Sequence, residues 1–306
     1  MPFSFERHIF NGENMLNFKK IEIEDYKTYY KFFKNSGELS CENSFVNLLV
    51  WQCGEYNKNY IAVCDNQLII KNGEGERESF RLPMGDDFQK GMKLIEEYSG
   101  DKKPRFWVQD GPRYEMFKEY AKGYSFRENR DTFDYIYLQS DLSSLSGKKF
   151  HSKRNHISAF SKAFDWCYEE ITDDNKADVL KCAETWYQEN VDRMDHYMVC
   201  EKKGIEFILD NMDELCVKGG AIYVDGKVVA FTLGSPITEE VFDIHIEKAL
   251  SEYAPAYAVI NREFAKTLEG YKYLNREDDL GLEGLRKAKL SYKPHIILKK
   301  FSCRAE

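Results

Sequence analysis

The sequence predicts an α/β protein (α+β) with two domains in tandem, each a mixed, largely antiparallel sheet flanked by helices. Its 306 residues fit two domains of roughly 150 residues each. Short strand patterns interleave with helical patterns along both halves, as expected for α/β layers. A polar, small-residue stretch at 140–147 separates the halves, so we expect domains at 15–143 and 144–306. Residues 1–14 show no period, and we expect a loosely held extension there.

In the first half, the apolar spacing changes several times between helical and strand-like. After a short strand at 18–23, apolar residues from Ile23 to Phe33 recur at helical spacing and predict a helix buried on one side. Alternation on both sides of Asp65-Asn66 predicts a hairpin over residues 60–70. The remaining predicted elements are a helix at 86–98, a strand at 105–109, a helix at 113–120 and a strand at 133–138.

The second half has a clearer element order. Asp225-Gly226 lies between two strand patterns, and its glycine suits the positive φ of a type I′ hairpin turn. Pro255 suits the first turn of a helix, because its missing N–H would have no partner there. The predicted order is a strand at 166–171, helices at 175–191 and 203–215, strands at 220–224, 228–234 and 241–247, a helix from 255, a strand at 271–274, a short helix at 282–288 and a strand at 295–301.

Composition and motifs exclude several classes of protein. A net charge of −8 argues against a surface that binds nucleic acid throughout, and no DNA partner is expected. No apolar run approaches the ~20 residues that cross a bilayer, and no leader pattern is present. We therefore expect no integral membrane segment and a cytoplasmic location. Without an HExxH motif, a CxxC pair or an acidic calcium loop, no metal site is expected.

The strand at 241–247 carries the first candidate residues. Alternate residues of a strand point the same way, which would place Asp243, His245 and Glu247 on one face. We expect Glu247 to act as general base with help from His245, and Asp243 to contact substrate. The alternative is a satisfied polar network, or side chains that face solvent.

A turn after the strand at 271–274 carries the second set. Ligands of open α/β sheets gather beyond the carboxyl ends of strands, so we expect Asn275 to contact substrate. Asp278 or Asp279 would hold a substrate ammonium, and Asp279 is also a catalytic candidate. Arg286 and Lys289 would hold a carboxylate or phosphate. The alternative is an acidic helix cap beside a solvated basic face.

A basic segment at the domain junction carries the third set. Its Lys and Arg residues alternate with aromatic and apolar residues between 148 and 164. An RNA backbone or another phosphate group could bind there through Lys149, Lys153, Arg154 and Asn155. An ordinary charged helix face explains the same pattern.

Several segments resemble a known family. They are CENSFVNLLVW (41–51), LSGKKFHSKRNHISAF (145–160), FDIHIEKA (242–249), IN-x-EF (260–264) and YLNREDDLGLEGLRKAKLSYKP (273–294). They are similar to the C-terminal domains of phosphatidylglycerol lysyltransferases, also called DUF2156, and the resemblance spans nearly the whole chain. The predicted element order resembles that of the GNAT-type acyl-CoA N-acyltransferases.

The resemblance implies an acyl or aminoacyl transferase. In the family, an aminoacyl group moves from charged tRNA to a lipid, but the large membrane-embedded part of those enzymes has no counterpart in this sequence. The expected donor is aminoacyl-tRNA or acyl-CoA, and the acceptor is a small-molecule amine or hydroxyl. Asn261 and Tyr292 fall in the matching segments and complete the set of substrate-binding candidates.

Two observations bear on the donor and on activity. Acetyltransferases cradle a pyrophosphate with a glycine-rich turn, and residues 247–261 contain no glycine, which favours tRNA over acyl-CoA. No GxSxG elbow is present, so transfer without a covalent enzyme intermediate is expected. A non-catalytic ligand-binding protein on a decayed transferase fold is the alternative from another class.

Overall fold

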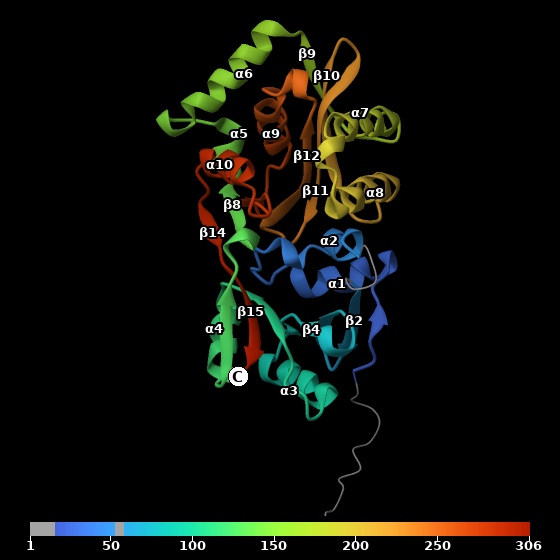
Figure 1. Cartoon of the computed structure of the whole chain (residues 1–306), viewed down its shortest axis with the longest axis vertical. Helices are drawn as coiled ribbons and strands as arrows, with labels where there is room; N and C mark the ends of the chain where they lie inside the picture. The colour runs from blue at the N-terminus through green and yellow to red at the C-terminus, as the bar shows by residue number, and fades with distance from the viewer. Residues whose placement is uncertain (1–15, 53–57) are drawn as a thin grey trace, which may run out of the picture.

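The computed structural model describes residues 16–52 and 58–306, which form two sheets arranged along the long axis of the molecule (Figure 1). The expected extension at 1–14 lies outside the described residues. Helices accompany both sheets, and each sheet combines one parallel strand pair with antiparallel pairs. The predicted α/β class with two mixed, largely antiparallel sheets is therefore confirmed. Within the described ranges, no helix is both long enough and apolar enough to span a bilayer.

The first sheet contains eight strands among the described residues. They are β1 (Lys19–Lys20), β2 (Asn59–Cys64), β3 (Gln67–Asn72), β4 (Ser79–Phe80), β5 (Met84–Gly85), β6 (Phe106–Gln109), β7 (Tyr124–Glu128) and β15 (Lys300–Ala305). Their order is β1-β2-β3-β4-β6-β15-β7, with β5 also paired to β3. The helices of this half are α1 (Tyr26–Phe33), α2 (Phe45–Val50), α3 (Phe88–Ser99) and α4 (Pro112–Tyr120).

The second sheet contains seven strands in the described part of the chain. They are β8 (Asp134–Leu138), β9 (Trp166–Glu170), β10 (Lys218–Val224), β11 (Lys227–Pro236), β12 (Val241–Ala249), β13 (Tyr273–Asn275) and β14 (Ile296–Leu298). Their order is β14-β8-β13-β12-β11-β10-β9. The helices are α5 (Gln139–Ser144), α6 (His151–Ala163), α7 (Lys176–Glu189), α8 (His196–Asp210), α9 (Ala256–Thr267) and α10 (Glu283–Ser291). The element order from β9 to β14 matches the predicted order.

Both predicted hairpin turns form with left-handed backbone. Asp65 and Asn66 have φ values of 50° and 59°, and Asp225 and Gly226 have values of 49° and 72°. Positive φ at both central residues is the signature of the type I′ turn, whose twist matches that of the flanking strands. The turn residues therefore fix where β2 meets β3 and where β10 meets β11.

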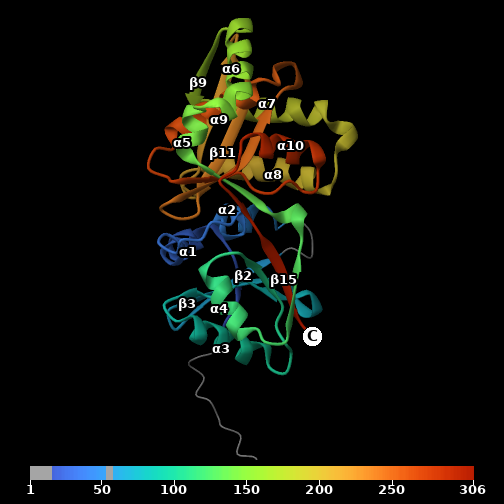
Figure 2. The ribbon, with the colours of Figure 1, turned by 90° about the vertical axis from the view of Figure 1, so that its left-hand side faces the viewer.

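The two halves exchange strands. β8 precedes the expected boundary at residues 143 and 144, yet it pairs with β13 and β14 of the second sheet. β15 ends the chain but lies between β6 and β7 of the first sheet, and Figure 2 shows it crossing from one half to the other. The single strand predicted at 295–301 is thus two strands in different sheets, β14 and β15.

The polar stretch at 140–147 is not a linker between domains. It contains α5, and Leu142 and Leu145 are fully buried in the cluster that α9 also joins. Gln139 donates to the carbonyl of Ala265 at 2.7 Å, which attaches the segment to α9. The structure differs from the expected boundary because two leucines three positions apart form an apolar stripe among the serines.

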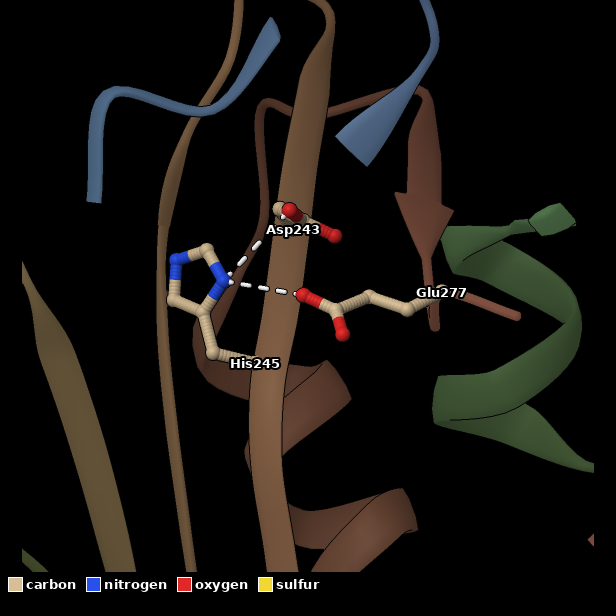
Figure 3. Close-up of side chains that lie close together, drawn as sticks. All are labelled: Asp243, His245 and Glu277. Carbon is tan, nitrogen blue, oxygen red and sulfur yellow. Dashed lines mark hydrogen bonds and ion pairs between the residues drawn. The ribbon is translucent and has the colours of Figure 1, made fainter. Parts of the chain in front are cut away.

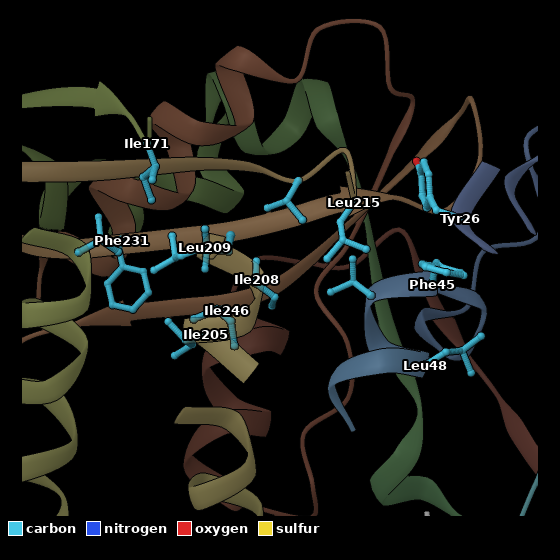
Figure 4. Packing of buried hydrophobic residues seen from close by; sticks show 14 of the residues in the cluster. Tyr26, Phe45, Leu48, Ile171, Ile205, Ile208, Leu209, Leu215, Phe231 and Ile246 are labelled. Atoms are coloured by element: carbon cyan, nitrogen blue, oxygen red, sulfur yellow. The ribbon is translucent and has the colours of Figure 1, made fainter. Parts of the chain in front are cut away.

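One hydrophobic cluster joins the two halves (Figure 4). It contains Phe45 of α2 together with Ile205 of α8 and Phe231 of β11. Helices α2 and α8 approach so closely that a Cβ added to Gly204 would overlap the side chain of Val50. The halves therefore share a core, and their relative position depends on close packing.

Candidate functional site

The candidate site lies where β12 and β13 separate. The strands pair in parallel from Val241 and Tyr273 to Asp243 and Asn275, and the described pairing ends there. β12 continues to Ala249, whereas β13 ends at Asn275. Polar side chains beyond this point can therefore face one another across an opening at the carboxyl end of β13.

A β-bulge in β12 decides which way its polar side chains point. In the ladder with β11, Ile246 pairs with Leu233 whereas Ile244 pairs with Gly234, so His245 is an extra residue. Ile244 packs in the cluster that contains α9, and Ile246 packs in the cluster that contains α7 and α8. The alternation of side chains is therefore shifted by one residue at His245.

The prediction that Asp243, His245 and Glu247 share one face is wrong. Asp243 contacts Asn47 of α2, and His245 lies with it, whereas Glu247 accepts a hydrogen bond from Asn261 of α9. A regular strand would have kept all three on one side, but the bulge at His245 divides them. The site consists of a Glu247 cluster and a His245 cluster on opposite faces of the sheet.

The Glu247 cluster surrounds one carboxylate. Arg276 Nη2 donates to Glu247 Oε1 at 2.6 Å, and Asn261 Nδ2 donates to Oε2 at 3.1 Å. The side chains of Glu247 and Arg276 are each 11% exposed. Within the described part of the chain, the buried atoms Arg276 Nη1 and Asn261 Oδ1 have no hydrogen-bond partner. One donor and one acceptor thus remain beside the carboxylate, and a polar ligand could satisfy both.

Aromatic rings and a second cation complete the Glu247 cluster. The Arg276 guanidinium lies 4.8 Å from the ring centre of Tyr292 and 5.7 Å from that of Tyr137. Lys153 Nζ lies 3.8 Å from the ring centre of Tyr292. Burial and, to a smaller extent, the charge of Arg276 lower the pKa of Lys153 to about 8, while the charge of Glu247 opposes the change. Two cations beside one carboxylate favour a ligand with an anionic or carbonyl oxygen.

Sequence reasoning missed Arg276 and Tyr137 as site residues. The one signal for Arg276 is its place directly after β13, as a lone basic residue before three acidic ones. Tyr137 belongs to β8, which lies far from β12 in sequence and joins the same sheet only through strand exchange. No local pattern could have assigned Tyr137 to this cluster.

The His245 cluster contains Asp243, His245 and Glu277 (Figure 3), and Asn47 of α2 donates a hydrogen bond to it. His245 Nδ1 is 3.2 Å from Glu277 Oε1 and 3.4 Å from Asp243 Oδ2, and Nε2 is 2.8 Å from Ser235 Oγ. Asn47 Nδ2 donates to Glu277 Oε1 at 2.9 Å and to Asp243 Oδ2 at 3.4 Å. Burial raises the pKa of Asp243 well above its ordinary value, and the charge of Glu277 adds to this.

A buried ion pair lies next to the His245 cluster. Lys300 Nζ of β15 is 2.7 Å from Asp134 Oδ1 of β8, and the side chains are 3% and 0% exposed. Burial alone would lower the pKa of Lys300, but the charge of Asp134 holds it well above its ordinary value. Asn275 Nδ2 donates to Asp134 Oδ2 at 3.1 Å and to the carbonyl of Leu39 at 2.8 Å. Asn275, a predicted substrate contact, thus joins the two halves.

Asp279 belongs to a separate ion-pair network. Its Oδ2 accepts from Tyr135 Oη at 2.5 Å and from Arg286 Nε at 2.8 Å, and Arg130 Nη1 lies 3.2 Å away. Burial raises the pKa of this carboxyl, but the bonds from Arg286 and Tyr135 outweigh that effect and hold it well below its ordinary value. Asp279 and Arg286, predicted for catalysis and substrate binding, hold the start of α10 against the loop before β8.

Asp278 and Lys289 stabilise the same turn. Lys289 is buried, and its Nζ donates to the backbone carbonyls of Arg276 and Asp278. Burial raises the pKa of Asp278 to about 7, and its Oδ1 accepts from the N–H of Leu280 at 3.1 Å. Lys289 therefore fixes the backbone that presents Arg276 to the Glu247 cluster.

The basic junction forms a 3-10 turn at Lys148–Phe150 and the start of α6. Lys149 pairs with Asp141 at 2.7 Å, and Arg154 donates to the carbonyls of residues 145 and 147. Asn155 is exposed, and Lys153 instead points to the Glu247 cluster. Of the four predicted RNA contacts, the structure brings Lys153 to the candidate site and keeps the others at the junction.

The turn between β12 and α9 already holds a carboxylate. The backbone N–H and Oγ of Ser251 both donate to Glu189 Oε2, at 2.9 and 2.6 Å. A pocket of about 540 Å³ adjoins this turn, and Asp192 and Arg193 contribute to its wall. An N–H group that a pyrophosphate could use is thus occupied by an acidic side chain.

Comparison with solved structures supports the fold. The chain is 38% identical to a protein of unknown function from Bacteroides thetaiotaomicron, with 95% of this chain and 100% of that chain covered and a TM-score of 0.88. L-PGS from Bacillus licheniformis is 16% identical, with 94% and 93% covered and a TM-score of 0.60. FemX is 9% identical, with 94% and 97% covered and a TM-score of 0.57. The similarities to L-PGS and to FemX show that this chain shares their fold.

Sequence comparison identifies the family. An uncharacterized protein of Mycoplasmoides gallisepticum is 23% identical over 172 residues, and the match spans 54% of that protein's length. The profile of the family described as phosphatidylglycerol lysyltransferase, C-terminal, matches residues 33–304. The match covers most of the chain and both sheets, so the protein belongs to this family.

Proposed function

We propose that the chain transfers an aminoacyl group from aminoacyl-tRNA to an amine or hydroxyl acceptor. The observation that carries the proposal is the Glu247 cluster, where Arg276 Nη1 and Asn261 Oδ1 have no hydrogen-bond partner within residues 16–52 and 58–306 and lie beside a buried carboxylate. An aminoacyl ester offers a carbonyl oxygen for the arginine and an ammonium group for the amide oxygen. Family membership and the acyltransferase fold support this class of reaction.

The turn before α9 supports tRNA over acyl-CoA as donor. It contains no glycine, and Glu189 occupies the N–H of Ser251. A pyrophosphate at this turn would have to displace the carboxylate of Glu189 from the N–H and hydroxyl of Ser251. The proposed reaction implies a cytoplasmic location, because aminoacyl-tRNA is made and used there.

In the proposed reaction, the acceptor attacks the ester carbonyl of the donor directly. A C–N or C–O bond to the acceptor forms while the ester C–O bond to the tRNA ribose breaks. Glu247 takes the proton that the acceptor loses, and the departing ribose oxygen gains one. Arg276 Nη1 donates to the carbonyl oxygen as negative charge develops there. Holding both substrates together supplies the remaining acceleration.

Equilibrium binding tests the proposal without knowledge of the acceptor. The probe is an acceptor-stem RNA hairpin that carries a lysyl group through a stable amide, and its fluorescence anisotropy is followed. We expect it to bind more tightly than the same hairpin without lysine. Glu247→Gln and Arg276→Met should each weaken binding of the lysyl hairpin about tenfold, the effect of losing one charge-assisted hydrogen bond.

Glu252→Gln is the matched control, because Glu252 is exposed in the turn before α9. It should bind the lysyl hairpin as the unchanged chain does. If coenzyme A binds instead and the hairpin does not, acyl-CoA is the donor. If neither binds, the transferase proposal is wrong and the chain is a non-catalytic protein. Once an acceptor is known, Glu247→Gln should lower the transfer rate by about 10²- to 10⁴-fold.

A further inference from the structure

The His245 cluster has the composition of a metal-binding site. Asp243, His245 and Glu277 each offer one ligand atom, and these atoms lie within 4.8 Å of one another. Their side chains are 0%, 3% and 20% exposed, so the group is not an open acidic surface. Two carboxylates and one imidazole are ligands that first-row divalent metal ions accept.

The spacing of the ligand atoms fits a tetrahedral ion. His245 Nδ1 lies 3.2 Å from Glu277 Oε1 and 3.4 Å from Asp243 Oδ2. Zinc bonds of ~2.0–2.1 Å at a tetrahedral angle place neighbouring ligands about 3.3 Å apart. The two distances from His245 agree with that value, and the two carboxylate oxygens lie within 4.8 Å of each other, so a small approach of the carboxylates would let one ion contact all three residues.

Asp243 provides an independent observation. Its side chain is fully buried, and its Oδ1 has no hydrogen-bond partner among the described residues. Asn47 Nδ2 is shared between Asp243 and Glu277, so one amide serves two carboxylates. A buried carboxylate normally has a cationic partner or several hydrogen bonds. Among the described residues, Asp243 has one long hydrogen bond, from Asn47, and the nearby imidazole of His245.

Ser235 holds the imidazole in the orientation that a metal needs. His245 Nε2 lies 2.8 Å from Ser235 Oγ, which leaves Nδ1 directed at the two carboxylates (Figure 3). Metal-bound histidines usually have their second ring nitrogen fixed by such a hydrogen bond.

We propose that Asp243, His245 and Glu277 bind a divalent ion of the zinc type. Asp243 and His245 belong to β12, and Glu277 follows β13, whose pairing with β12 ends at Asp243 and Asn275. The ion would link β12 to the segment after β13 at the point where the backbone hydrogen bonds between the two strands end. Because Glu277 follows Arg276 directly, the ion would also steady the backbone that carries the guanidinium of the Glu247 cluster. This site does not depend on the proposed transfer reaction.

Zinc binding by the full chain tests the proposal. The purified protein is stripped with EDTA and titrated with zinc chloride by calorimetry, and bound zinc is measured by mass spectrometry after dialysis. We expect one zinc per chain and a higher melting temperature with zinc. His245→Ala and Glu277→Gln should lose this binding, and Ser235→Ala should weaken it about 10- to 100-fold.

His156→Ala is the control, because His156 is exposed on α6 and should leave binding unchanged. Glu277→Gln keeps the size of the side chain, and the circular dichroism of each variant shows whether it is folded. The proposal is overturned if the stripped protein takes up no zinc. It is equally overturned if folded His245→Ala and folded Glu277→Gln bind zinc as the unchanged chain does.

Discussion

The two faces of the second sheet balance their buried charges differently. On the α9 face, Glu247 has its own cation in Arg276, and Lys153 adds a second. On the face toward α2, Asp243 and Glu277 lie near His245. The buried lysine of β15, Lys300, forms an ion pair with Asp134 instead. The α9 face thus has two cations for one carboxylate, and the opposite face has three carboxylates for one lysine and one histidine, although β12 contributes a carboxylate to each face.

This difference shows that one extra residue in a strand can place two sites on opposite faces of a sheet. A single extra residue at His245 directs Glu247 to one face and Asp243 to the other. On the α9 face, two buried polar atoms have no hydrogen-bond partner in the part of the chain that the structure describes, which suits a ligand that binds reversibly. The opposite face joins the two halves of the molecule, so its charges should matter more to folding.

The largest expected effect on stability is at Lys300. Lys300→Met removes the cation 2.7 Å from Asp134 and leaves a fully buried carboxylate unpaired. We expect the free energy of unfolding to fall by about 3–5 kcal/mol, because breaking a buried pair strands the other charge. Urea denaturation followed by circular dichroism measures this change.

Lys299→Met is the control, since Lys299 pairs with Glu128 at the surface, where both side chains are about half exposed. It should change stability by no more than about 0.5 kcal/mol. If both variants lowered the free energy of unfolding equally, the Lys300–Asp134 pair would not contribute more to stability than a surface pair.

A smaller effect is expected at the apolar part of the same face. Gly204→Ala places a methyl group where Cγ1 of Val50 lies, so the Val50 side chain must change its rotamer or α2 and α8 must move apart. Overpacking of this kind costs about 1–3 kcal/mol. Gly284→Ala in α10 is the control, because nothing lies within 4 Å of the added Cβ, and it should be neutral or stabilising. If Gly204→Ala is equally harmless, the junction of the halves is looser than its packing indicates.

Most of the fold could be predicted from the sequence, because its signals are local. The type I′ turns at Asp65 and Asp225 and the apolar stripes of the helices place nearly every element. The exchange of β8 and β15 could not be predicted, since a strand pattern shows which face is buried but not which sheet it joins. Residues 140–147 looked like a linker for a different reason, because serines outnumber the two buried leucines, Leu142 and Leu145.

The candidate site was predicted less well, for a related reason. Glu247, Asn261 and Tyr292, predicted as catalytic and substrate-binding residues, lie in one cluster, and Lys153, predicted as an RNA contact, lies there with them. Their chief partner Arg276 was missed, and the bulge at His245 has no signal that separates it from a regular strand. The expectation of no metal rested on motifs in continuous sequence, whereas Asp243 and Glu277 come from different elements.

The smallest expected effect is a pH dependence at Lys153 on the α9 face. Its pKa is about 8 in the folded chain and near its ordinary value of 10.5 when unfolded. Below pH 8 both states hold the proton, and the folded state bears the full cost of the buried charge. Between pH 8 and 10.5 only the unfolded state keeps the proton, so the contribution of Lys153 to stability rises with pH in this window. Lys153→Met should remove this contribution and lower the change in stability with pH, whereas Lys162→Met, which alters an exposed lysine at the end of the same helix, should match the unchanged chain. Urea unfolding at pH 7.5 and 9.5 compares the two variants with the unchanged chain. If the free energy of unfolding changed with pH equally in all three proteins, the pKa of Lys153 would be ordinary. Burial on the α9 face would then not destabilise its charged form.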